Sequence, residues 1–466
     1  MDMEKWSSRL LIIFSGAILL QFIAFYNGFP LVYSDTGTYI YSGFDSFVPK
    51  DRPIFYGLLV KWFSLKKSLW GVVFIQNLLT SFVVFEFSKL IHSKLSAIQY
   101  IGITFFLVCI TSIGWYSNQI MPDFFAPLLV LAVVWFLLVR KSHWLKKFLM
   151  AFVILAANLS HFAHLFLTSF LIIVIFLFYL LYKRKDSLVF FYELKSKLFL
   201  LATITVFSWI LIPSIHSFYG GGLRLSKGSH VFLVAHLNEK GILKEILDIH
   251  CDTPTLENCS LCKDKNELPK DIDGFIWSGT FLERHGGWDE SEEQFSKIIR
   301  LSLSSPHFLA SNIFYSFVYS FAQLPHIEIG EGLTAYNEHS APYGQVAWRF
   351  PNELNSYLNS KQNNYNGVNL TFDSLNIFHW IVQINSIFLI LFILANKERI
   401  KITRQHIWLI YFLGISILGN ALVTAGLSAP YTRYQSRVMW IIPLLVLLLL
   451  FHYRKNIWKI VRTNTE

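Results

Sequence analysis

Residues 10–39 read LLIIFSGAILLQFIAFYNGFPLVYSDTGTY, a long apolar run that ends in a polar cluster. An apolar run of roughly 17–25 residues can cross a bilayer as a helix, and 10–28 is such a run. It lacks a small-residue cleavage site, so we interpret it as a retained span and not as a signal peptide. Residues 33–39 then bring a carboxylate, hydroxyls and a glycine to the point where this helix leaves the bilayer.

The composition extends this prediction to the whole chain. Of 466 residues, 54% are hydrophobic and only 15% are charged, whereas soluble domains carry about 25% charged residues. The sequence therefore predicts an all-α polytopic membrane protein with about ten or more transmembrane helices. The predicted spans are 10–28, 69–90, 98–115, 124–139, 148–160, 165–182, 198–216, 376–396, 406–425 and 438–453.

The basic residues predict the orientation, because short cytoplasmic loops of membrane proteins collect Lys and Arg. With the N-terminus in the cytoplasm, alternation places the basic stretches 140–147, 397–404 and 454–462 inside. The short outer loops 116–122 and 160–164 contain no Lys or Arg. The net charge of +10 is thus explained by topology, and we expect no nucleic-acid partner. We expect a multi-pass protein of a bacterial inner membrane, surrounded by membrane lipids.

The pattern of spans divides the chain into three parts. Residues 1–216 form an N-terminal transmembrane module that includes the first outer loop. Residues 217–375 form a large extracytoplasmic region, and residues 376–466 form a C-terminal transmembrane module. Nearly all polar residues that could take part in catalysis or binding then lie on the outer face.

Amphipathic patterns predict helices that do not span the bilayer. Segments 53–67 and 306–324 carry apolar residues at helical spacing with polar residues between them, which is typical of interfacial helices. A span at 306–324 would also move the basic stretch 397–404 to the outside, against the charge rule. Within the outer region we expect helices at 231–248 and 291–303.

Three cysteines lie close together in the outer region: Cys251, Cys259 and Cys262. One disulfide with a spare thiol suits an oxidising compartment. The alternative is a zinc site, for which His250 or His285 would supply the fourth ligand.

Asp35 in the first outer loop has two interpretations. Ser34 or Asp35 would suit an N-cap for a helix that continues through Thr38 and Tyr39. The functional alternative is a general base, or a group that orients an acceptor nucleophile, in a partly dry cleft beside the bilayer. Gly37 would allow a ligand to approach the backbone closely.

Asp123 lies at the outer end of a predicted span. It could favour the positive end of a helix dipole, yet a charged residue at that depth needs a partner or a task. Asp35 and Asp123 on one face would form a carboxylate pair that shares acid–base work or binds a divalent cation.

Three arginines are candidate phosphate contacts, because a guanidinium matches phosphate geometry. Arg52 follows the first outer loop, where a plain turn before Pro53 is the alternative. Arg433 and Arg437 are four residues apart and so share a helix face. Their predicted outer location runs against the usual enrichment of Lys and Arg on the cytoplasmic side, which favours a phosphate-binding role. The alternative is that both side chains only snorkel to the membrane interface.

His161 and His164 are spaced to share one side of a helix. With Asp35 or Asp123 they would form a metal site, so a divalent metal is a candidate cofactor. Histidines of outer loops more commonly only hydrogen-bond. Both histidines are also candidate substrate contacts, as are Tyr39 and Tyr434.

These motifs resemble the GT-C superfamily of membrane glycosyltransferases, which includes protein mannosyltransferases and bacterial lipid A aminoarabinose transferases. The resemblance rests on Asp35 in the first outer loop, Arg52-Pro53 before an amphipathic helix, Pro122-Asp123 at the end of a span and Arg433-Tyr434 near the last span. The first outer loop of this chain reads Asp-Thr-Gly, whereas the commonest form of this loop in the superfamily has two adjacent acidic residues.

The resemblance implies transfer of a sugar from a polyprenyl-phosphate donor to a saccharide, lipid or protein acceptor at the outer face, with inversion at the anomeric carbon. It implies Asp35 as catalytic base or acceptor-orienting group and Arg433, with Arg437, as phosphate contacts. Beside it we expect Asp123 to be a second acid or a ligand of a metal or of the acceptor. A lipid-linked polysaccharide polymerase or ligase is the alternative enzyme. A transporter or flippase fits less well, since such proteins carry mid-membrane ionisable groups and repeated halves.

Overall fold

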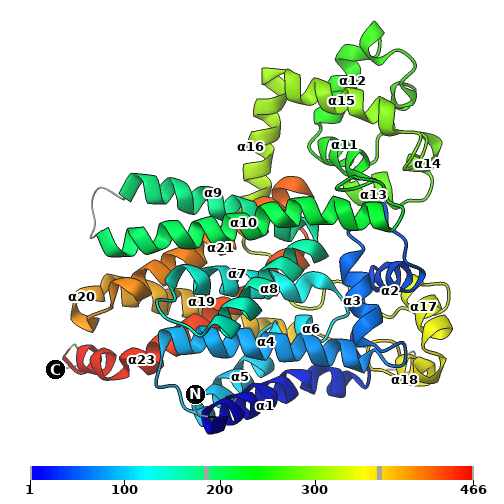
Figure 1. The fold of residues 1–466 in the computed structure, drawn as a ribbon. Coiled ribbons are helices and arrows are strands. Elements are labelled where there is room, and N and C mark those ends of the chain that lie inside the picture. Colours follow the sequence, from blue (N-terminus) through cyan, green and yellow to red (C-terminus); the bar gives the residue numbers. More distant parts are fainter. Residues whose placement is uncertain (1–2, 183–187, 365–369, 464–466) are drawn as a thin grey trace.

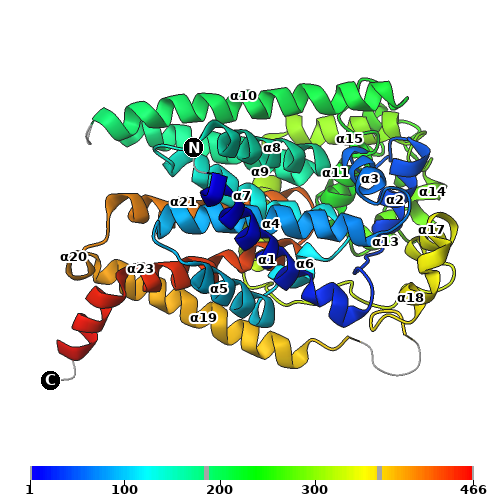
Figure 2. The same ribbon diagram turned by 60° about the horizontal axis from the view of Figure 1, so that its bottom comes forward.

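The structure is a computed structural model, and it describes residues 3–182, 188–364 and 370–463. Within these ranges the elements are helices, and an isolated bridge joins Leu31 to Gln119. Long helices pack side by side in a bundle that runs across Figure 1. Both chain ends lie at one end of this bundle, which we call the terminal end (Figures 1 and 2). The opposite end, which we call the α2 end, carries α2, α3 and α17.

The helices of the bundle coincide with the predicted apolar runs. They are α1 (Met3–Asn27), α4 (Trp70–Ile91), α5 (Ala97–Ile110), α7 (Phe125–Leu138), α8 (Trp144–Ser160), α9 (Phe162–Tyr182), α10 (Leu188–Phe218), α19 (Asp373–Ala395), α21 (Arg404–Leu427) and α23 (Ile441–Thr463). Every residue of α7 is buried, so this helix forms the centre of the bundle.

Seven segments of the described chain are long and apolar enough to cross a membrane: Ser7–Asn27, Trp70–Ile91, Phe162–Leu181, Glu193–Phe218, Asp373–Ala395, Arg404–Leu427 and Thr432–Ile460. The fold is therefore that of an all-helical polytopic membrane protein. The remaining predicted runs form α5, α7 and α8, with 14, 14 and 17 residues. Helices α5 and α7 are shorter than the predicted runs 98–115 and 124–139, since each ends at an extended residue, Thr111 and Val139. Helix α8 is longer than the predicted run 148–160, because it begins at Trp144.

Short helices close the α2 end of the bundle and position the loops there. They are α2 (Thr36–Asp45), α3 (Phe55–Phe63), α6 (Ile113–Ser117), η1 (Pro122–Phe124), α17 (Ala341–Arg349), η4 (Pro351–Glu353), α18 (Leu354–Leu358) and α22 (Thr432–Met439). One further short helix, α20 (Lys397–Ile400), lies at the terminal end.

Helices α2 and α3 cross at two glycines. A Cβ at Gly43 would lie 1.9 Å from the carbonyl oxygen of Gly57, so only glycine permits this contact. Gly37 has a similar role, because its Cβ would lie 2.5 Å from the backbone of Ala341 in α17. The close approach at Gly37 is thus made by α17, and the predicted approach by a ligand is wrong.

The region 217–375 divides into two parts with different cores. Residues 229–304 have a hydrophobic core of their own, and we call this part the disulfide domain. Residues 327–372 instead contribute Ile329, Phe350 and Tyr357 to the core of the bundle. The helices of the disulfide domain are α11 (Ser229–Glu239), α12 (Ile242–His250), η2 (Pro254–Leu256), η3 (Ser260–Cys262), α13 (Ile272–Ile276), α14 (Phe281–Arg284) and α15 (Glu292–Ser304).

Two sequence predictions for this region are tested directly. The helix expected at 231–248 is broken into α11 and α12, because Gly241 adopts the left-handed conformation with φ 73°. The segment 306–324 is the helix α16 (Pro306–Gln323), and it is not one of the seven long apolar segments of the described chain. In Figure 1 it runs across the bundle axis, packed against α21, with Phe314, Phe317 and Phe321 exposed.

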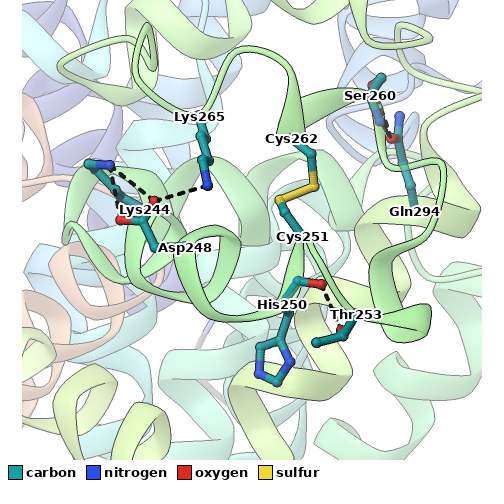
Figure 3. Close-up of a disulfide and its surroundings, with 9 residues drawn as sticks. All are labelled: Lys244, Asp248, His250, Cys251, Thr253, Ser260, Cys262, Lys265 and Gln294. Atoms are coloured by element: carbon teal, nitrogen blue, oxygen red, sulfur yellow. Dashed lines mark hydrogen bonds and ion pairs between the residues drawn. A yellow bond between two sulfur atoms is a disulfide. The ribbon is translucent and has the colours of Figure 1, made fainter.

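Cys251 and Cys262 form a disulfide, and Cys259 is a buried free thiol (Figure 3). Within the described residues, no group of three or more His, Cys, Asp or Glu side chains could hold a metal ion. His285 instead lies 2.9 Å from Ser260 and 3.2 Å from Asp264. The disulfide interpretation is therefore confirmed and the zinc alternative is wrong.

We expect the double substitution Cys251→Ala and Cys262→Ala to destabilise the disulfide domain by about 2–3 kcal/mol, the usual effect of opening a short cross-linked loop. Limited proteolysis of the full-length protein should show faster cleavage in residues 229–304. The control Cys259→Ala should change the cleavage rate far less, because it breaks no cross-link. Equal rates for the two variants would contradict a stabilising role for the disulfide.

Candidate functional site

Asp35 lies at the centre of a cluster of charges at the α2 end. It occupies the N-cap position of α2, but its side chain makes no capping hydrogen bond. Its Oδ1 accepts a hydrogen bond from Arg52 Nη2 at 3.1 Å, and its Oδ2 accepts one from Arg433 Nη1 at 3.4 Å. The interpretation of Asp35 as a simple helix cap is therefore wrong, and we call this arrangement the Asp35 clamp.

The first arginine of the clamp is held from several sides. Arg52 Nε donates to Asp51 at 2.8 Å, and its guanidinium lies 5.0 Å from the ring centroid of Tyr39. Tyr39 is only 1% exposed, and its ring packs edge-on against Tyr56 at 4.9 Å. Tyr39 therefore packs against the guanidinium of Arg52, and its contact with a substrate stays a prediction.

The second arginine of the clamp lies in the first turn of α22. The guanidinium of Arg433 is 4.4 Å from the ring centroid of Tyr33 and 5.0 Å from that of Tyr434. Its backbone N–H donates to Glu331 Oε2 at 2.5 Å. These contacts fix the side chain against two aromatic faces, and cations are attracted to such faces.

Glu331 is a site residue that sequence reasoning missed. It lies between Gly330 and Gly332, both of which have positive φ. A Cβ at Gly332 would lie 1.7 Å from the ring of Tyr33, so the loop reaches the site only because this residue is glycine. An acid between two glycines was the available signal in the sequence.

The second predicted acid, Asp123, has a different arginine partner from Asp35. Asp123 Oδ1 accepts a hydrogen bond from Arg437 Nη1 at 2.9 Å, and the two side chains are 3% and 0% exposed. Asp123 is therefore bound by Arg437, whereas Asp35 is bound by Arg52 and Arg433. Arg437 is buried against Asp123 and the ring of Tyr434, and its role as a phosphate contact stays a prediction.

The ionisation of the clamp follows from its charges. Burial by itself would raise the pKa of Asp35, but the positive charges of Arg52 and Arg433 outweigh burial and lower this pKa to about 2. Glu331 is different, because burial raises its pKa above the ordinary value despite the nearby Arg433. Asp35 is therefore a carboxylate at neutral pH, while Glu331 holds a proton more readily than a free glutamate.

Several guanidinium nitrogens at the site are buried and have no protein partner in the described part of the chain. They are Arg52 Nη1, Arg433 Nε, and Arg437 Nε and Nη2. A buried donor without an acceptor is costly, and more so on a charged group. Unfilled donors on neighbouring arginines are what an anionic ligand with several oxygens would satisfy.

The two histidines lie at the junction of α8 and α9, with ring centroids 5.2 Å apart. His164 is 1% exposed, and its Nδ1 lies 3.0 Å from the carbonyl oxygen of Ala157. His161 accepts the Ala163 N–H at 3.1 Å. Burial and then the charges of the site arginines lower the pKa of His161 to about 3, so this ring is neutral beside the site.

The predicted metal site is not assembled in the described chain. No group of three or more potential ligands is close enough there to hold a metal ion. The physical reason is that Asp35 and Asp123 are already bound by guanidinium groups.

Comparison with the models of protein families, with curated proteins and with solved structures finds no match to this chain.

Proposed function

We propose that this protein is a membrane glycosyltransferase of the GT-C type, which moves a sugar from a polyprenyl-phosphate donor to an acceptor. The observation that carries the proposal is the Asp35 clamp with its buried, unfilled guanidinium donors. A carboxylate and anion-binding donors side by side are the two groups that such a transfer requires. The seven long apolar helices would let the isoprenoid tail of the donor stay in the bilayer.

In this proposal Arg52 and Arg433 bind the phosphate of the donor. Asp35 accepts a proton from the acceptor hydroxyl while the oxygen of that hydroxyl attacks the anomeric carbon. The bond from that carbon to the phosphate oxygen breaks, and its electron pair leaves with the phosphate, whose charge the arginines stabilise. One displacement with one base inverts the anomeric centre, which is the outcome that the resemblance to the superfamily implies.

The clamp would also couple donor binding to basicity. A carboxylate with a pKa of about 2 is a weak base, and general-base catalysis works best when the pKa is near the working pH. A phosphate that takes hydrogen bonds from Arg52 and Arg433 shares their positive charge with Asp35. The pKa of Asp35 then rises, so the base becomes effective only when the donor is in place.

The proposed topology has a cytoplasmic N-terminus and about ten crossings, with α5, α7 and α8 as the short ones. The Asp35 clamp then faces the extracytoplasmic side. In support, α20 and both chain ends, with their basic residues, lie at the terminal end of the bundle, as cytoplasmic segments do. The direct contact of Asp35 with Arg433 requires both residues to be on one side.

The test is donor consumption by the full-length protein in proteoliposomes. Radiolabelled polyprenyl-phosphate sugars and polyprenyl-diphosphate sugars are supplied separately, each with a mixture of saccharide acceptors. We expect consumption of a monophosphate donor, and loss of it in Arg433→Ala. Consumption of a diphosphate donor alone would favour the polymerase or ligase, and consumption of neither would reject a lipid-linked sugar transferase.

The pH profile of kcat/KM gives a second check, because it reports groups of the free enzyme. The active form of Asp35 is ionised, so activity is lost only as the pH falls through its pKa. A pKa of about 2 predicts no acid limb above about pH 4. In Arg433→Gln the carboxylate loses one cation, so the limb should move to higher pH. A wild-type limb centred above pH 5 would contradict an ion-paired Asp35.

A further inference from the structure

Three aromatic rings gather on the disulfide domain, and we call them the aromatic cluster. The rings of Phe232, Trp277 and Trp288 pack against one another with centroid separations of 6.3, 5.8 and 5.7 Å. Trp277 is nevertheless 52% exposed. Large aromatic rings are normally mostly buried, so Trp277 gives the domain a flat, exposed apolar surface.

One side of the cluster is joined to the segment that carries Arg52. Asp289, next to Trp288, forms an ion pair with Lys50 at 2.8 Å, and Lys50 is two residues before Arg52. The N–H of Gly228 donates to the carbonyl oxygen of Lys50 at 2.7 Å. A Cβ on Gly228 would lie 2.6 Å from the Trp288 ring, so this backbone contact is closely packed.

The other side is joined to the segment that carries Arg433. The hydroxyl of Tyr431 donates to Asp273 at 2.8 Å. Tyr431 is two residues before Arg433, and Asp273 is four residues before Trp277. Ala429 and Tyr431 also pack in the core of the disulfide domain. The aromatic cluster is thus bracketed by contacts to both arginine-bearing segments of the Asp35 clamp.

The ring spacing decides what kind of ligand could bind. A cation enclosed by several rings must lie within about 6 Å of each centroid with the rings apart around it. Here the rings touch each other at the separations of ordinary aromatic pairs, which leaves no space between them for a cation. The cluster can therefore only offer an outer face on which a flat ligand lies.

We propose that the aromatic cluster is the acceptor subsite of the enzyme and binds a sugar ring of a saccharide chain on the exposed face of Trp277. This inference rests on the proposed glycosyltransferase function. It selects a saccharide from the acceptor classes, and it places the chain so that its end reaches the Asp35 clamp.

The chemistry around the ring favours a saccharide. One face of a pyranose carries C–H bonds with partial positive charge, which complement the negative face of an aromatic ring. The hydroxyls at the edge of the sugar need hydrogen-bond partners, and the cluster is flanked by the carboxylates of Asp273 and Asp289 and by Lys50. A lipid tail or an apolar helix would displace water from these charged groups without offering hydrogen bonds in return.

The experiment measures binding without catalysis. Full-length protein in detergent is applied to an array of linear oligosaccharides of two to eight residues, as wild type, Trp277→Ala and Trp277→Phe. Trp348→Ala is the matched control, because Trp348 is 60% exposed but stacks on Arg349 at 3.5 Å, apart from the cluster. Size-exclusion elution identical to wild type establishes that each variant is folded.

We expect Trp277→Ala to weaken binding about tenfold, the effect of losing one aromatic contact, and Trp277→Phe to retain most of it. Trp348→Ala should bind as wild type does. The inference is overturned if wild type binds no saccharide, or if Trp277→Ala binds as well as Trp348→Ala. Saccharide binding that depends on Trp277, without consumption of any lipid-linked donor, would instead uphold the subsite and reject the transferase.

Discussion

Asp35→Asn should lower kcat for sugar transfer by about 10²–10⁴-fold, the usual contribution of a positioned general base. Asparagine keeps the size of the side chain but cannot accept the proton. The KM for the donor should not rise, because Arg52 and Arg433 lose a competitor for the donor phosphate. Initial rates in proteoliposomes, with donor and acceptor varied separately, distinguish the two parameters.

Asp45→Asn is the matched control for this result. Asp45 is the last residue of the same helix α2, and it pairs with Arg349 near the surface, where the two side chains are 34% and 19% exposed. We expect nearly unchanged transfer. The proposed base is rejected if folded Asp35→Asn protein transfers sugar at the wild-type rate, or if both substitutions reduce transfer equally.

Arg437→Met should give the largest loss of stability among single substitutions at the site. It leaves Asp123 ionised and buried without its partner, and breaking a buried pair in this way costs about 3–5 kcal/mol. Arg437 also anchors α22, the helix that carries Arg433, so donor binding should weaken as well. Thermal unfolding of the protein in detergent, followed by tryptophan fluorescence, measures the first effect.

Arg349→Met supplies the comparison, since exposed pairs contribute about 0–1 kcal/mol. Adding Asp123→Leu to Arg437→Met should recover much of the lost stability, because the double variant buries no isolated charge. If Arg437→Met unfolds at the same temperature as Arg349→Met, the pair with Asp123 is not the stabilising contact described here.

Part of the candidate site could be predicted from local sequence. Asp35, Arg52 and Arg433 are polar residues at the ends of apolar runs, and the structure confirms that all three meet at one end of the bundle. The two possibilities for Asp35 could not be separated in this way. An N-cap and an ion-paired base require the same residue type at the same position. The cap is excluded only by the folded structure, in which Arg52 and Arg433 bind the carboxylate of Asp35.

Other features depend on contacts between distant parts of the chain. Arg433 is 398 residues from Asp35, and Arg437 is 314 residues from Asp123. Both arginines share a face of α22, so nothing in their spacing tells which of the two acids each would meet. Glu331 escaped prediction for the same reason, because its partner is a backbone N–H that only the folded chain brings near.

The sequence by itself determined the helical membrane character of this protein, the positions of its apolar helices and the disulfide-bearing polar region, because hydrophobic length and charge are local properties of the chain. The tertiary structure alone decided the lengths of α5, α7 and α8, the break at Gly241 and the pairing of each acid with its own arginine. Those outcomes depend on packing and on the cost of burying an unpaired charge, and both are settled only when distant segments come into contact.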